Sequence, residues 1–105
     1  MPLNPALSLV IQVPDPALTL RRQRLVSSLF KYVVEIQELE DGYAFKFRPS
    51  ELVSRRIADY ILFEGQHSPQ LTFMLVAEPN GGALWLQVRG LESEKQHIRT
   101  AYTIL

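Results

Sequence analysis

An Asn-Gly pair between two alternating apolar segments constrains the fold of this chain more than any other feature. Residues 71 to 78 read LTFMLVAE, residues 83 to 89 read ALWLQVR, and the turn sequence PNGG lies between them. Asparagine and glycine tolerate the positive φ angles that a tight turn between antiparallel strands requires. The two segments therefore predict a β-hairpin.

Alternation along this hairpin assigns its side chains to two faces. The face expected to meet the core carries Leu71, Phe73, Leu75, Leu84, Leu86 and Val88. The reverse face carries Met74, Val76 and Trp85, and is more apolar than a solvent-exposed sheet face requires. We expect these three residues either to contact a partner or to be covered by residues 9 to 13.

A second hairpin is predicted earlier in the chain. Residues 32 to 37 follow a period of two, with Val34 and Ile36 on one side, and a turn at residues 40 to 42 follows them. Residues 43 to 48 then alternate again. The aromatic face of that second strand, formed by Tyr43, Phe45 and Phe47, is expected to point to the core.

Three helices are predicted around these hairpins, over residues 16 to 30, 51 to 64 and 91 to 103. Ser50 suits an N-cap and Gly65 suits a helix stop. In the last helix, the residues expected to share an apolar face are Leu91, Ile98, Tyr102 and Leu105.

The order of these elements predicts an α+β fold with a single domain, residues 1 to 105. Paired strands indicate an antiparallel sheet, with helices packed mainly on one face. We expect a two-layer sandwich with a ββαββα core, preceded by an N-terminal helix. Residues 7 to 13 form either an extra N-terminal strand or an ordered tail.

Composition excludes several classes of protein. Lysine plus arginine and aspartate plus glutamate number 11 each, which argues against nucleic-acid binding through phosphates. The longest uncharged apolar run, residues 71 to 77, is much shorter than the roughly 20 residues of a membrane span. The chain has no cysteine, so thiol chemistry is excluded and a cytoplasmic location is expected.

Arg22 falls in the middle of the apolar arc of the first predicted helix. Its stem either extends along the core to water or forms a buried ion pair. Together with Arg21 and Arg24, it also suggests an adaptor whose basic cluster meets an acidic partner.

Glu64 and His67 are the best candidates for chemistry in the sequence. Glu64 lies on the apolar side of its helix, three residues before the histidine. With Phe47 and Tyr60, these two residues suggest a pocket for a small molecule, or else Glu64 bends outward or pairs with an arginine. We expect no cofactor and no metal site, and His67 is only a weak candidate for a metal ligand.

Three segments from residue 39 onward read LEDGYAFKF, FEGQHSPQLTFMLVAEPNGGALWLQVRG and EKQHI. Through these segments the chain resembles a small family of uncharacterised bacterial proteins. Residues matching the family pattern are Glu64, Pro69, Glu78, Pro79, Trp85, Leu86 and Gly90. The cysteine pair of the family's Cys-Cys-Pro motif is replaced here by His67 and Ser68, so a thiol role does not carry over. The resemblance implies no established activity.

These observations favour a non-catalytic module that binds a ligand or another protein. We expect a homodimer formed through the reverse face of the second hairpin, with Met74, Val76 and Trp85 in the contact. No common nucleotide-binding, nucleophile or zinc motif is present. The alternative is a metal-dependent or acid/base enzyme that uses Glu64 and His67.

Overall fold

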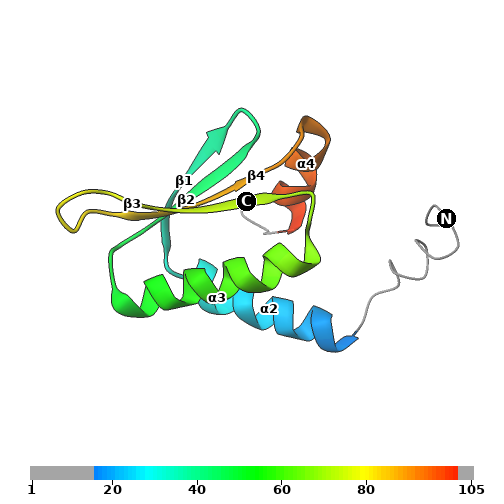
Figure 1. The fold of residues 1–105 in the computed structure, drawn as a ribbon, viewed down its shortest axis with the longest axis horizontal. Helices are drawn as coiled ribbons and strands as arrows, with labels where there is room; N and C mark the ends of the chain where they lie inside the picture. Colours follow the sequence, from blue (N-terminus) through cyan, green and yellow to red (C-terminus); the bar gives the residue numbers. More distant parts are fainter. Residues whose placement is uncertain (1–15, 102–105) are drawn as a thin grey trace, which may run out of the picture.

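Helices alternate with pairs of strands along this chain (Figure 1). The computed structural model describes residues 16 to 101. Their elements, in chain order, are α2 (Pro16–Phe30), β1 (Val33–Leu39), β2 (Gly42–Phe47), α3 (Glu51–His67), β3 (Thr72–Ala77), β4 (Leu84–Arg89) and α4 (Glu92–Ala101). The protein is α+β, as the sequence predicts. The strand or tail expected at residues 7 to 13 lies outside the described residues.

The four strands form one antiparallel sheet in the order β1-β2-β4-β3. β1 and β2 form the first hairpin, β3 and β4 form the second, and β2 pairs with β4 between them. Both predicted hairpins are confirmed. β2 and β4 are the central strands, so β1 and β3 lie at the two edges of the sheet.

The turn of the second hairpin has the backbone that its sequence predicts. Asn80 has a φ of 59° and Gly81 has a φ of 70°. The Glu78 backbone N–H donates to the Ala83 carbonyl oxygen at 2.9 Å, which closes the hairpin beside the turn. Asparagine and glycine occupy these positions because they adopt positive φ at low cost.

An irregularity in β1 changes which side chains reach the core. Val33 lies opposite Phe47 and Ile36 lies opposite Phe45, with a register shift between Val33 and Glu35. Val33 packs against the core, whereas Val34 is 49% exposed. By this register Val33 and Ile36 both lie on the side of Phe47 and Phe45, which plain alternation does not predict, because the extra residue of a bulge shifts the alternation.

Helix α3 begins where the sequence predicts and ends later. Ser50 caps it, since its hydroxyl accepts a hydrogen bond from the Val53 backbone N–H at 3.0 Å. Gly65 does not stop the helix, which continues to His67. The stop comes from Pro69, because a proline disfavours helical backbone in the residue before it. Ser68 accordingly has φ −135° and ψ 67°.

Helix α4 buries less of its predicted apolar face than expected. Ile98 is fully buried, but Leu91 is 75% exposed. Leu91 precedes the first helical residue, Glu92, so helical periodicity does not turn it toward the core. The other predicted members of this face, Tyr102 and Leu105, lie outside the described residues.

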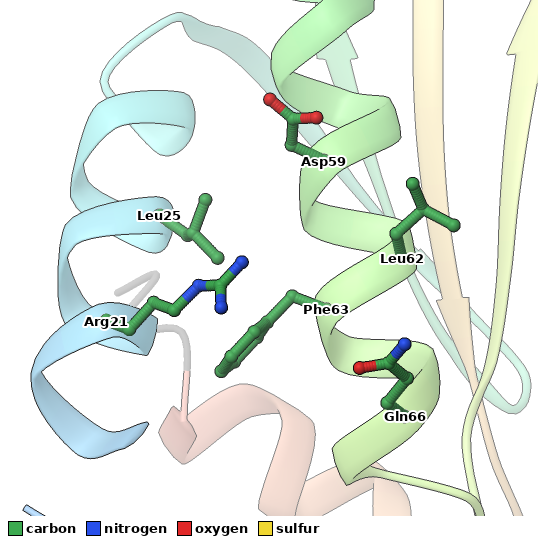
Figure 2. Close-up of a pocket in the computed structure, with 6 residues that line it drawn as sticks. All are labelled: Arg21, Leu25, Asp59, Leu62, Phe63 and Gln66. Atoms are coloured by element: carbon green, nitrogen blue, oxygen red, sulfur yellow. The ribbon is translucent and has the colours of Figure 1, made fainter. Parts of the chain in front are cut away.

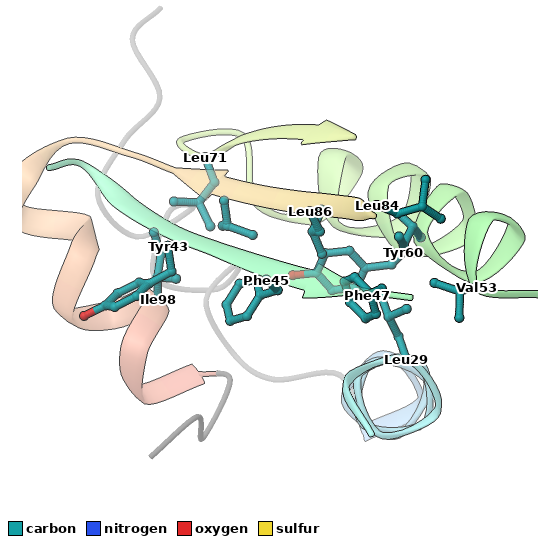
Figure 3. Close-up of a cluster of buried hydrophobic side chains, with 12 residues drawn as sticks. Leu29, Tyr43, Phe45, Phe47, Val53, Tyr60, Leu71, Leu84, Leu86 and Ile98 are labelled. Carbon is teal, nitrogen blue, oxygen red and sulfur yellow. The ribbon is translucent and has the colours of Figure 1, made fainter. Parts of the chain in front are cut away.

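One cluster of apolar side chains fills the space between sheet and helices (Figure 3). Its buried members are Leu29, Tyr43, Phe45, Phe47, Val53, Ile57, Tyr60, Leu71, Leu84, Leu86, Val88 and Ile98. The aromatic face of β2 points into this core, as predicted. Packing of α3 against β3 and of α4 against β2 joins the helices to the sheet. Within residues 16 to 101, no helix combines the length and apolar character needed to cross a membrane.

Candidate interaction surface

Glu64 of α3 and Arg22 of α2 form an ion pair. Arg22 Nη2 lies 2.9 Å from Glu64 Oε2, and Arg22 Nε donates a hydrogen bond to the same oxygen at 3.1 Å. The Glu64 side chain is 1% exposed and that of Arg22 is 34% exposed. Of the interpretations open for these residues, the structure shows the ion pair, which places a counter-charge beside a buried carboxylate.

His67 is exposed in the last turn of α3. Its ring lies 4.5 Å from that of Phe63, measured between ring centroids. The Arg21 guanidinium lies 5.1 Å from the centroid of the same phenylalanine ring. His67 thus has a stacking partner on its own helix, while the Glu64 carboxylate is held by α2. In residues 16 to 101, no group of three acidic or histidine side chains is arranged to hold a metal ion.

The other two predicted pocket residues belong to the core. Phe47 and Tyr60 are both 0% exposed. The Tyr60 ring packs edge-on against Phe30 and Phe73, at centroid distances of 5.7 and 5.8 Å. Three of the four predicted pocket residues are therefore buried among core side chains, and only His67 reaches the surface.

A groove that the sequence does not predict runs between α2 and α3 (Figure 2). It encloses about 330 Å³, and its lining residues are Arg21, Leu25, Asp59, Leu62, Phe63 and Gln66. Leu62 is 68% exposed, so it is a leucine on the outer side of a helix that is otherwise amphipathic. An apolar residue on the polar side of the helical pattern is the sequence signal that could have pointed to this groove. The lining is mixed, with one cation, one anion and one amide beside three apolar side chains.

A second hollow, of about 380 Å³, lies at the turn between β1 and β2. Glu40, Asp41, Gly90 and Leu91 line it. Asp41 is paired with Arg89 across the end of the sheet. The Gly90 backbone N–H also donates to the Asp41 carbonyl oxygen at 2.8 Å. This aspartate is therefore engaged in holding the sheet end together.

The register of the strands identifies the residues on the reverse face of the sheet. Glu35 lies opposite Lys46, Lys46 opposite Trp85, and Trp85 opposite Val76. In the neighbouring row Met74 lies opposite Gln87. Residues facing one another across antiparallel strands point to the same side, so Met74, Val76 and Trp85 share one face. We call these three residues the sheet patch.

The sheet patch is partly exposed and has a charged border. Met74 is 44% exposed, and Trp85 and Val76 are each partly exposed. Lys46 Nζ lies 5.6 Å from the centroid of a Trp85 ring and 3.7 Å from Glu35 Oε1. An apolar centre with polar residues around it is typical of a protein contact surface.

Contacts of α4 place this helix on the opposite side of the sheet from the patch. Lys95 of α4 donates a hydrogen bond to Glu38 and also lies over the Tyr43 ring. Glu38 and Tyr43 face one another in the register, and Tyr43 is a core residue. The hydrogen bond and charge of Lys95 lower the pKa of Glu38 below its ordinary value of 4.5. Helix α4 is thus held on the core side.

Comparisons of the sequence with protein families and with curated proteins, and of the structure with solved structures, found no match.

Proposed function

We propose that this chain is a non-catalytic protein-interaction module that associates with a second copy of itself through the β3–β4 hairpin. The observation that carries the proposal is the sheet patch of Met74, Val76 and Trp85. These side chains lie partly exposed on a sheet face. Within residues 16 to 101, the helices contact the other face, where the aromatic residues of β2 are buried.

The proposal includes a particular architecture. We take the α+β fold to be a two-layer sandwich with a ββαββα core, in which α2 precedes the first hairpin. In such a sandwich the helices form one layer and the sheet forms the other. Within the described residues no helix then covers the reverse face of the sheet, and a two-fold contact at the β3–β4 hairpin sets the two sheet patches side by side.

The proposed module acts without catalysis, in the cytoplasm, where a protein without cysteine is at no disadvantage. Acid/base chemistry by Glu64 and His67 has less support. A general base must reach a substrate proton within hydrogen-bond distance, and the Glu64 carboxylate is buried beside Arg22. A groove of mixed polarity between α2 and α3 is the better candidate for a small ligand, and it includes neither residue.

Changing Trp85 to glutamate tests the proposed contact. Size-exclusion chromatography with light scattering should give a dimer for the wild type and a monomer for Trp85→Glu, because the substitution introduces charge into an apolar interface. Leu20→Glu is the matched control, since it places the same charge at a 47% exposed leucine on α2 and should leave the dimer intact.

Trp85 is the only tryptophan in the chain, so its fluorescence reports directly on the contact. Dilution of the wild type should shift its emission to longer wavelength as the ring enters water. A Trp85→Glu variant that elutes with the same mass as the wild type would remove the sheet patch from the interface.

A further inference from the structure

The two edges of the sheet differ in how well they resist pairing with another strand. β1 has the sequence VVEIQEL, with two glutamates and a bulge after Val33. Charged side chains and bulges are the usual protection of an exposed edge. β3 has the sequence TFMLVA, without charge, proline or glycine. Only the β3 edge therefore has the composition of a strand that pairs readily.

The backbone of β3 presents hydrogen-bonding groups on its outer side. Among the described residues, β3 pairs with β4 alone. Glu78 donates its N–H to Ala83 on the β4 side, and inward and outward positions alternate along an antiparallel strand. Counting back from Glu78, the N–H and C=O groups of Phe73, Leu75 and Ala77 point away from β4.

The side chains of β3 are exposed on both faces beyond its first residues. Phe73 is packed against the core and contacts the Tyr60 ring. Leu75 lies opposite Leu86 on the core side and is nevertheless 42% exposed, while Met74 on the reverse side is 44% exposed. The hairpin extends past α3 toward its turn (Figure 1). An additional strand beside β3 would cover both side chains.

We propose that β3 pairs with β3 of a second copy in antiparallel orientation, centred on Leu75. This inference rests on the proposed self-association and specifies its geometry. A two-fold axis perpendicular to the sheet makes the two sheets continuous and keeps both helix layers on the same side. On the other side Met74 and Val76 of the two copies then adjoin, and each Trp85 lies one strand further in, on β4.

The position of the centre follows from the backbone. Centring on Leu75 places Leu75 opposite its own copy and Phe73 opposite Ala77 of the second copy. The backbone N–H and C=O groups of all three outward residues then form hydrogen bonds with the second copy. Met74 of one copy faces Val76 of the other on the reverse side, so apolar residues meet apolar residues across the pairing.

The side of α3 next to this edge leaves room for a second copy. Arg56 donates to the Ser28 carbonyl oxygen of α2 at 2.8 Å, and Phe63 lies beside Arg21, so this flank of α3 faces α2. Residues two positions after Arg56 and Phe63 are rotated by nearly half a turn around the helix axis, so they point to the opposite flank of α3. Ala58 and Gly65 lie there with the exposed Leu62 between them on the helix surface, and none of these three residues carries a charge that would repel a neighbouring copy.

Charge substitution at Leu75 tests the two-fold pairing. Leu75→Lys and Leu75→Glu should each weaken dimerisation by about tenfold or more, because like charges directly opposite one another across strands are destabilising. An equimolar mixture of the two variants should form a heterodimer, since the two-fold axis then brings a lysine opposite a glutamate. Leu20→Lys and Leu20→Glu, alone and mixed, are the matched controls, because Leu20 is a 47% exposed leucine on α2, away from β3, and these variants should dimerise as the wild type does.

Sedimentation velocity measures these associations, with circular dichroism to verify that each variant is folded. Dimerisation unchanged in both Leu75 variants, or a mixture that stays monomeric, would overturn the β3 pairing. Loss of the dimer in Trp85→Glu with no effect at Leu75 would refute the edge contact and leave the proposed function intact. Loss of the dimer in the Leu75 variants with no effect of Trp85→Glu would retain the edge contact and exclude Trp85 from it.

Discussion

Arg22→Leu is expected to lower the free energy of unfolding by about 3 kcal/mol, because removing one partner of a buried ion pair leaves the other charge in the core. The Glu64 side chain is 1% exposed with Arg22 in place, so a leucine at position 22 would leave a buried carboxylate without this counter-charge. Urea denaturation followed by circular dichroism measures the loss.

The pair also predicts an asymmetry between its two members. Glu64→Leu should cost only about 1 kcal/mol, because the Arg22 side chain is 34% exposed and its cation can turn toward water. Combining Arg22→Leu with Glu64→Leu should restore most of the stability, since apolar replacement of a buried pair is often neutral. A double variant less stable than Arg22→Leu would contradict this account of the interface between α2 and α3.

Gly42→Ala is expected to cost about 3 kcal/mol through overpacking between the two central strands. A Cβ at Gly42 would lie 1.9 Å from the Val88 carbonyl oxygen and 2.9 Å from the Arg89 Cα. Both obstacles are backbone atoms of β4, so no side-chain rotation relieves the clash. Chemical denaturation should show a large drop in the midpoint concentration.

Gly65→Ala provides the matched control for that substitution. No atom lies within 4 Å of the Cβ position at Gly65, and this residue is exposed within α3. Alanine is favoured over glycine in a helix by about 1 kcal/mol, so this variant should gain stability. Equal effects of the two alanine substitutions would show that the close approach of β2 and β4 is not what requires glycine at position 42.

Local sequence signals were sufficient to predict the hairpins. Asn80 and Gly81 specify the turn through their own backbone preferences, and alternation in β2 places Phe45 and Phe47 in the core. These features depend on neighbours in the chain. Strand order does not depend on neighbours in the chain, because the pairing of β2 with β4 joins residues more than 40 positions apart, such as Phe45 and Leu86.

The errors in the sequence analysis share a physical cause, which is that tertiary contacts override local signals. Gly65 was expected to end α3, but a helix held by Glu64 and Phe63 on its buried side tolerates one exposed glycine. Plain alternation puts Val33 and Ile36 on opposite faces, but the bulge in β1 places them on the same side. A bulge adds one residue without a distinctive composition, so periodicity alone does not reveal it.

The candidate surfaces were predictable to different degrees. Met74, Val76 and Trp85 were grouped correctly on one face because strand alternation has a period of two. The ion pair of Arg22 and Glu64 was one of several alternatives, because sequence does not show which charged residues meet. The exposed edge at β3 was not predictable, because a strand is an edge only once the order of the sheet is known.

Amide hydrogen exchange at β3 is the most direct test of the claim that this hairpin is a self-association surface. The account predicts slow exchange for the amides of Phe73, Leu75 and Ala77 at high protein concentration, and faster exchange on dilution, because a second copy supplies their hydrogen-bond acceptors. Exchange at these three amides that is fast at every concentration, or that does not change on dilution, would contradict it.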